Sequence, residues 1–109
     1  MIYDTLSRIR KKFADALFSR SYPEEIYTVL EDILTTADAD SGTEKLGLFH
    51  FFCDNDKTNG KEACEKFFIA LRTVYLWRED IISTAMVLCA EKGLFSLKDS
   101  LKEEAEKWN

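Results

Sequence analysis

The stretch that most constrains the fold is residues 61–93, because it has no proline and its only glycine is its last residue. Its apolar residues recur at helical spacing in two series: Ala63, Phe67, Leu71 and Val74, then Ile81, Ile82, Ala85, Leu88 and Cys89. Trp77 lies where the two series meet, and the charged Arg78-Glu79-Asp80 follows it. The pattern predicts two core helices joined at Trp77. Such a pair has too much apolar surface to stand alone in water, so the rest of the chain must cover it.

Two helices are predicted before this pair, in the first third of the chain. Residues 2–18 form the first, with an apolar stripe at steps of three and four: Ile2, Leu6, Ile9, Phe13 and Leu17. Pro23 starts the second, since proline suits the first helical position. The buried face of this helix is expected to comprise Ile26, Val29, Leu30, Ile33 and Leu34. The run 35–42, TTADADSG, reads as a turn-rich linker.

A short third helix and a sixth complete the expected set. Thr43 is the expected N-cap of the third. Its inward residues would be Leu46, Phe49, Phe52 and Cys53, and the polar loop 54–60 follows. Gly93 reads as a C-cap, and Ser96, with Asp99 three residues on, as the N-cap of the last helix. That helix would run through Leu97, Leu101, Ala105 and Trp108. Short connections favour an all-α fold: a compact antiparallel six-helix bundle, with residues 1–109 as one domain.

Composition narrows the functional class. The chain is 46% hydrophobic and 32% charged, which describes a compact folded domain and not a disordered one. No apolar run is long enough to span a bilayer, and the N-terminus does not read as a signal peptide. A net charge of −5 disfavours generic binding to a nucleic-acid backbone. Three cysteines without a C-x-x-C motif indicate buried, reduced thiols, so we expect a cytoplasmic protein.

Charge is distributed unevenly along the chain. A basic cluster near the start comprises Arg8, Arg10, Lys11 and Lys12. Acidic residues follow it: Glu24, Glu25, Glu31, Asp32, Asp38 and Asp40. A solvated helix face with i, i+4 ion pairs would also explain the basic cluster. Alternatively, one basic and one acidic face would attract copies of the chain or its relatives.

The loop 54–65 has some features of a calcium site. Oxygen-bearing side chains stand at loop positions 1, 3, 5, 9 and 12, as in an EF-hand, and predicted helices flank them. However, Asn59 occupies the position that favours glycine, and Lys61 the position that is normally apolar. A solvated loop therefore remains the simpler interpretation.

Zinc and catalytic sites have weaker support. His50 and Cys53 are one helical turn apart, and Cys64 and Cys89 follow, but the spacing fits no compact zinc module. A Cys64–His50 pair is the only nucleophile candidate, and Cys64 is expected to be buried. We therefore expect no catalytic residues, no metal and no cofactor.

The run EACEKFFIALRTVYLWREDIISTAMVLCAEKGLFSLKDSLKE resembles the C-terminal half of a caspase recruitment domain (CARD), especially the CARDs of RIG-I-like RNA helicases and their mitochondrial adaptor. In that family, a tryptophan opens the fifth helix, which ends near a glycine before a short sixth helix. The matching features are Phe67, Leu71, Trp77, Ile81-Ile82, Gly93 and Leu97–Leu101. The run IRKKFADALFSRSYPEEIYTVLEDILTTADAD similarly resembles the first two helices, and Asn55–Gly60 the polar turn before the fourth.

The resemblance implies a death-fold module for homotypic CARD–CARD assembly in innate immune or apoptotic signalling. Its partner would be another such domain or a second copy, with no nucleic acid and no membrane. Three expected contact sets are the basic cluster, the acidic residues Glu24, Glu25, Glu31 and Asp32, and the run Trp77, Arg78, Glu79 and Asp80. Two alternatives stay open. One is a small acidic immunity protein or antitoxin that neutralises a basic toxin, and the other is a calcium-binding helix–loop–helix.

Overall fold

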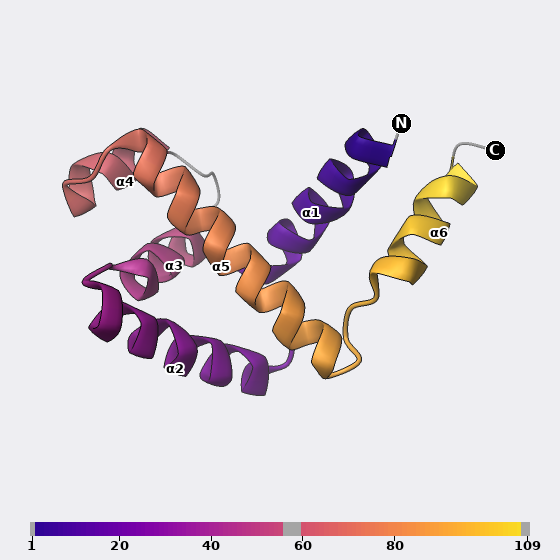
Figure 1. Ribbon diagram of the computed structural model, residues 1–109, viewed down its shortest axis with the longest axis horizontal. Coiled ribbons are helices and arrows are strands. Elements are labelled where there is room, and N and C mark those ends of the chain that lie inside the picture. Colours follow the sequence, from indigo (N-terminus) through magenta and orange to yellow (C-terminus); the bar gives the residue numbers. More distant parts are fainter. Residues whose placement is uncertain (1, 56–59, 108–109) are drawn as a thin grey trace.

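The computed structural model describes residues 2–55 and 60–107, and this part of the chain forms six helices and no strand (Figure 1). They are α1 (Ile2–Phe18), α2 (Glu24–Ser41), α3 (Lys45–Asp54), α4 (Gly60–Phe67), α5 (Leu71–Glu91) and α6 (Leu97–Lys107). The predicted all-helical class is confirmed. Buried residues of α1 to α5 form one apolar cluster, and Phe95 packs against it from the loop before α6.

Helix α5 is the central element of the bundle. It crosses the middle of the molecule and packs against α1, α2, α3 and α4 (Figure 1). Helix α6 packs only against α1 within the described residues. Helices α1 and α6 run side by side in opposite directions, which brings the two ends of the chain to the same side of the molecule (Figure 1).

The predicted helix boundary at Trp77 is wrong, because α5 runs unbroken from Leu71 to Glu91. The charged residues after Trp77 fit within the helix because each has a neighbour to contact. Arg78 lies over the Phe18 ring at 5.3 Å, and the next two residues pair with cations of other helices. A polar run in the sequence therefore marks an inter-helix contact and not a break.

The break between α4 and α5 lies instead at residues 68–70. Phe68 adopts a left-handed backbone, with φ of 55°, and the Ile69 N–H donates to the Cys64 carbonyl at 3.3 Å. This geometry ends α4 as a C-terminal glycine usually would. Phenylalanine rarely takes that conformation, so no residue type in this stretch marks the turn.

The predicted linker 35–42 is also wrong, because α2 continues to Ser41 and ends at Gly42, with φ of 67°. The hydroxyls of Thr35 and Thr36 donate to carbonyls one turn earlier, at 2.7 and 3.0 Å. Turn-forming side chains are thus satisfied inside the helix, and the linker shortens to residues 42–44.

The predicted N-cap at Thr43 is wrong as well. Helix α3 is capped by Asp38 from α2, whose carboxylate accepts the N–H groups of Lys45 and Leu46 at 2.9 and 3.0 Å. The Thr43 hydroxyl donates to the same carboxylate. A carboxylate at a helix N-terminus also interacts favourably with the helix dipole, so Asp38 fixes the angle between α2 and α3.

The predicted C-cap of α5 and the predicted N-cap of α6 are both confirmed. Gly93 has φ of 73°, and the Leu94 N–H donates to the Cys89 carbonyl at 2.8 Å, which closes a Schellman turn. The Ser96 hydroxyl accepts the Asp99 N–H at 3.2 Å as the cap of α6. Leu97 and Ala105 are exposed rather than inward, and Trp108 lies outside the described residues.

Core predictions hold for most apolar positions. Predicted inward residues that are buried include Ile9, Phe13, Leu17, Ile26, Leu30, Leu34, Phe49, Phe52, Ala63, Val74, Ile81, Ile82, Ala85, Leu88 and Cys89. Those that are exposed are Leu6, Val29, Ile33, Leu71, Leu97 and Ala105. The structure adds Tyr27, which is fully buried and whose hydroxyl donates to the Leu17 carbonyl at 2.9 Å. No described helix is long and apolar enough to cross a bilayer.

Arg10 joins α1 to α5 through a network of contacts. Its guanidinium donates to the Glu79 carboxylate at 2.6 Å, to the Glu79 carbonyl at 2.9 Å and to the Ser83 hydroxyl at 2.7 Å. Several charge-assisted bonds from one side chain fix both distance and angle between the two helices. Arg10 is therefore part of the scaffold.

Removing the cap of α3 is expected to destabilise the fold. The change Asp38→Ala leaves two N–H groups of α3 without their acceptor and should lower the free energy of unfolding by about 1 kcal/mol. Urea denaturation followed by circular dichroism measures this. Thr43→Val, which removes only one hydroxyl, is the control. A larger loss at Thr43 than at Asp38 would contradict the capping assignment.

Truncating Arg10 is expected to cost more than truncating its exposed neighbour. Arg10→Ala should lower the free energy of unfolding by roughly 1 to 2 kcal/mol, because it removes the bonds from α1 to Glu79 and Ser83 of α5. Lys11→Ala should change it by less than about 0.5 kcal/mol. The same denaturation experiment compares the two, and equal effects would show that the Arg10 network adds no stability.

Candidate partner-binding surfaces

The basic cluster on α1 is largely neutralised inside the molecule. Arg8 pairs with Glu104 at 3.5 Å and Lys12 with Glu103 at 3.0 Å, which ties α1 to α6. The bond to Glu103 raises the pKa of Lys12, and the same contact lowers the pKa of Glu103. With Arg10 bound to α5, Lys11 is the only member of the cluster that has no ion pair within the described residues.

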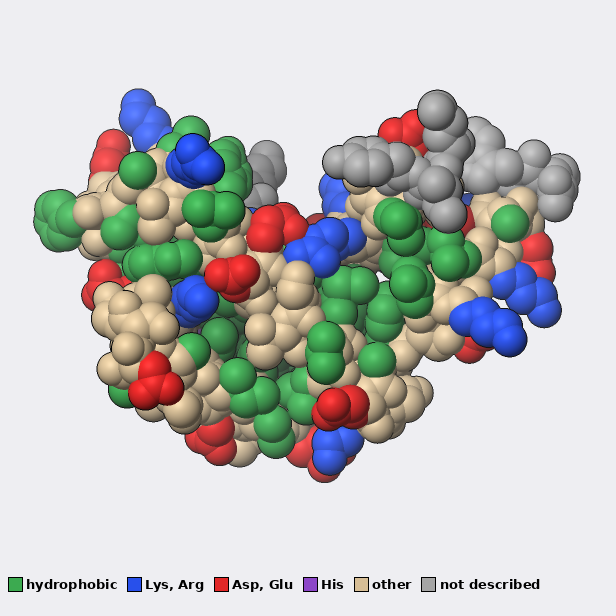
Figure 2. All heavy atoms as spheres, viewed as in Figure 1, with side chains coloured by type: hydrophobic (Ala, Val, Ile, Leu, Met, Phe, Trp, Pro, Cys, Tyr) green, Lys and Arg blue, Asp and Glu red, His purple; other side chains and the backbone are tan. Residues whose placement is uncertain are grey.

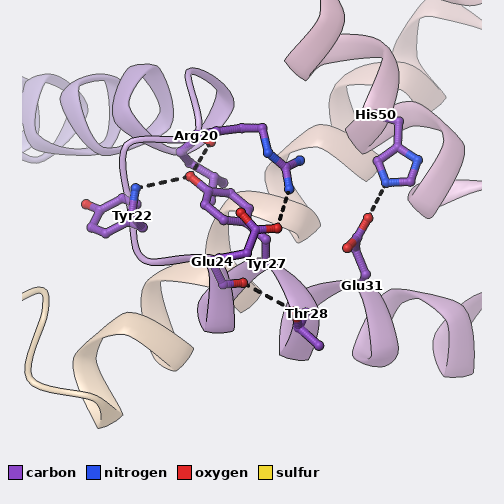
Figure 3. Close-up of polar contacts among 8 residues, drawn as sticks. Arg20, Tyr22, Glu24, Tyr27, Thr28, Glu31 and His50 are labelled. Carbon is purple, nitrogen blue, oxygen red and sulfur yellow. Dashed lines mark hydrogen bonds and ion pairs between the residues drawn. The ribbon is translucent and has the colours of Figure 1, made fainter.

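Two of the four predicted acidic contacts are also engaged. Glu24 pairs with Arg20 at 3.3 Å across the turn between α1 and α2, and Glu31 bonds to His50 of α3 (Figure 3). Glu25 and Asp32 are exposed, and neither carboxylate has a cation partner in the described part of the chain. The acidic face of α2 therefore keeps two unneutralised charges.

The third predicted contact set serves the interior of the molecule. Trp77 is half-buried against the core, and Arg78 lies over the rings of Phe18 and Phe52. The Arg78 Nε is buried and has no hydrogen-bond partner among the described residues. Asp80 pairs with Lys45 of α3 at 3.2 Å. These residues hold α1, α3 and α5 together, so their first role is structural.

The metal and catalytic candidates do not converge in the described part of the chain. No group of three or more His, Cys, Asp or Glu side chains there could hold a metal ion. His50 contacts Glu31, and Cys64 is half-buried rather than buried as expected. Burial raises the pKa of the Cys53 and Cys89 thiols, which disfavours the reactive thiolate. The calcium hypothesis depends partly on 56–59, which lie outside the described residues.

A groove between α2 and α5 is the surface that the sequence did not indicate. Ile33 of α2 lines it together with Thr84, Val87, Leu88 and Glu91 of α5, around an open hollow of about 360 Å³. Val87 is 61% exposed and Ile33 39% exposed. Figure 2 shows apolar side chains gathered over α2 and the C-terminal part of α5, with acidic side chains at the edge.

Helical spacing extends this groove along α2. Val29 precedes Ile33 by one turn and is 37% exposed. Glu25 precedes Val29 by one turn, and Asp32 follows Val29 by three residues, so both carboxylates lie beside the apolar stripe. We call Val29, Ile33 and Val87, with the carboxylates of Glu25, Asp32 and Glu91, the α2/α5 groove.

The apolar residues of α2 carry a signal for this surface in the sequence. Apolar residues occur at positions 26, 27, 29, 30, 33 and 34, an arc broader than one buried face requires. The core takes the side with Tyr27 and Leu34, which leaves Val29 and Ile33 at the exposed edge. An apolar arc wider than one buried face therefore indicates that part of a helix stays exposed and apolar.

A second exposed apolar surface lies where α4 meets α5. Phe68 is 93% exposed, and Leu71, Tyr75 and Leu76 are each about half-exposed. Hydrophobic side chains are visible over this part of the molecule in Figure 2. Exposed apolar clusters on folded domains commonly mark interaction sites. We call these four residues the α4–α5 patch.

Comparison with known proteins gives no relative: no family model, curated protein or solved structure matches the chain.

Replacing Phe68 by asparagine is expected to stabilise the fold. The Phe68 backbone is left-handed, which asparagine tolerates better, and a side chain so exposed loses little packing. The free energy of unfolding should rise by about 0.5 to 1 kcal/mol. Thermal and urea denaturation measure the change. The control Phe67→Asn, at a residue packed on the core, should destabilise instead.

Proposed function

We propose that this chain is a cytoplasmic protein–protein interaction module that assembles by homotypic contacts, as CARDs do in innate immune or apoptotic signalling, and that it is not an enzyme. The observation that carries the proposal is the α2/α5 groove, whose apolar residues remain exposed beside unneutralised carboxylates. A surface of this composition is suited to a protein partner.

The groove has the general composition of a protein interface. Interfaces commonly have an apolar centre, which loses contact with water, and a polar rim. Val29, Ile33 and Val87 would supply the centre. A partner that buries them gains from the hydrophobic effect, and its basic residues gain from the rim carboxylates. The expected partner surface is therefore apolar and basic.

Support for the CARD part of the proposal comes from the helix count and the C-terminal end. The described residues form six helices, and Gly93 and Ser96 separate α5 from α6 as the resemblance implies. Trp77 departs from the family pattern, since it lies within α5 and does not open it. The proposal therefore rests less on Trp77 than on the interaction surface.

The structure narrows the residues expected to bind a partner. Arg8, Arg10 and Lys12 are held by other helices, so reversing their charge would disturb the fold together with binding. Glu25 and Asp32 form no ion pair with another helix in the described part of the chain. Of the predicted contact sets, the acidic rim of the groove can therefore be mutated with the least disturbance of the fold.

If the chain is instead an acidic immunity protein or antitoxin, it would bind its toxin through the same groove. A basic toxin would also be attracted by the rim carboxylates. The two functions differ in self-association, which the homotypic module requires and the inhibitor does not.

Placing a cation in the groove is expected to abolish association. We expect the purified chain to self-associate with a dissociation constant in the range of about 1 μM to 1 mM, typical of weak contacts. Val87→Lys should weaken this at least tenfold, because the ammonium group occupies the apolar centre and neutralises the rim. Sedimentation velocity over a concentration series measures it.

Leu76→Lys is the matched control, since it puts the same side chain at a similarly exposed position of α5. It should leave association unchanged. Loss of association at Leu76 and not at Val87 would move the interface to the α4–α5 patch. A wild-type chain that remains monomeric up to about 1 mM would overturn the homotypic function and favour the inhibitor.

A further inference from the structure

We infer that a hollow between α1 and α5 binds a phosphate group, which Lys11 and Arg78 hold. The hollow is open and has a volume of about 360 Å³. Its lining includes Ser7, Arg10, Lys11 and Ala14 of α1 with Arg78 and Glu79 of α5, and we call it the α1/α5 hollow. It shares no lining residue with the α2/α5 groove, so phosphate binding here requires no self-association.

Arg78 has hydrogen-bond donors without acceptors. Its side chain is 22% exposed, and its Nε is buried without a hydrogen-bond partner among the described residues. Its contact with the Glu79 carboxylate, from a terminal nitrogen, measures 3.6 Å, which is too long for a hydrogen bond. Arginine carries five N–H donors, and buried polar groups are nearly always paired. The guanidinium therefore has donors available for an acceptor from outside the chain.

Two aromatic rings hold this guanidinium in place. Its central carbon lies 5.3 Å from the centre of the Phe18 ring and 5.8 Å from the centre of the Phe52 ring. Such contacts use the flat face of the guanidinium and leave the N–H donors at its edge for an anion. A side chain that is already held by packing loses little conformational freedom on binding, which favours affinity.

Cations outnumber carboxylates in the α1/α5 hollow. Three cations line it, Arg10, Lys11 and Arg78, against the single carboxylate of Glu79. Arg10 already donates three hydrogen bonds to α5, so it contributes mainly its charge. Lys11 is exposed, has no ion pair in the described part of the chain, and lies one turn from the Ser7 hydroxyl. A phosphate group, with a charge of about −1.5 to −2 at neutral pH, matches this surplus of positive charge.

A second hollow beside Arg78 suits an anion less well. It has a volume of about 420 Å³, and it is lined by the carboxylate of Asp15 and by residues at the C-terminal ends of α1 and α3. The C-terminal end of a helix carries partial negative charge, so these two ends and Asp15 would repel an anion. Asp15 lies one turn from Lys11 but forms no ion pair with it within residues 2–55 and 60–107, which leaves the Lys11 ammonium available.

Titration with inorganic phosphate, followed by NMR at constant ionic strength, tests the site. The backbone amide resonances of residues 7, 11 and 78 and the side-chain Nε–H resonance of Arg78 should shift and saturate, with a dissociation constant of about 1 mM. Acetate should bind more weakly, because its single charge balances less of the positive charge. O-phosphoserine distinguishes the source of the phosphate. Tighter binding than inorganic phosphate assigns the site to a phosphorylated ligand, and weaker binding assigns it to the free ion.

Single substitutions separate this site from general attraction by charge. Arg78→Gln and Lys11→Gln should each weaken phosphate binding at least tenfold, as the loss of a charge-assisted hydrogen bond predicts. The matched controls Arg72→Gln, on the same helix, and Lys98→Gln, on α6, remove exposed cations outside the hollow and should bind phosphate as the wild type does. Circular dichroism checks that each variant retains its helical content. Because Lys11 is exposed, its variant gives a result even if Arg78→Gln fails to fold.

Three results would overturn the phosphate site. The first is a set of shifts that do not saturate by about 10 mM phosphate. The second is unchanged binding in Lys11→Gln or in a folded Arg78→Gln. The third is an equal loss of binding in the control variants, which would show attraction to positive charge in general. Self-association is measured separately by sedimentation, so the phosphate site and the homotypic function can fail independently.

Discussion

The structure depends on burial of one face of α5 along its whole length. This helix contacts α1, α2, α3 and α4, and its buried residues run from Val74 to Cys89. A helix of 21 residues is about 30 Å long, enough to support α4 and α3 at one end and α1 and α2 further along. Because α5 is continuous, the helices that pack against it are held as one body.

Charged residues then fix the angles at which the helices cross. Arg10 holds α1 to α5, Lys45 holds α3 to the same turn of α5 through Asp80, and Asp38 links α2 to the start of α3. Apolar packing is non-directional, whereas these bonds require particular distances and angles. They also use charges that would otherwise face a partner, which leaves few candidates for recognition.

The proposed assembly follows from what the internal contacts leave over. On α2, the core covers only one side of a broad apolar arc, and the exposed remainder lies beside carboxylates without partners. On α6, Glu103 and Glu104 pair with cations of α1. Exposed apolar groups beside unneutralised carboxylates suit contact with a protein partner.

The sequence by itself determined the all-helical class, most core positions, the cluster of charge on each helix and the caps at Gly93 and Ser96. These features arise from periodicity and from bonds between residues a few positions apart. The tertiary structure decided where α4 ends, how far α2 extends, and which charges remain available. Arg10 and Glu79 are 69 residues apart, and the turn at Phe68 has no local glycine to mark it. Such features depend on packing between distant segments, which no short stretch of sequence encodes.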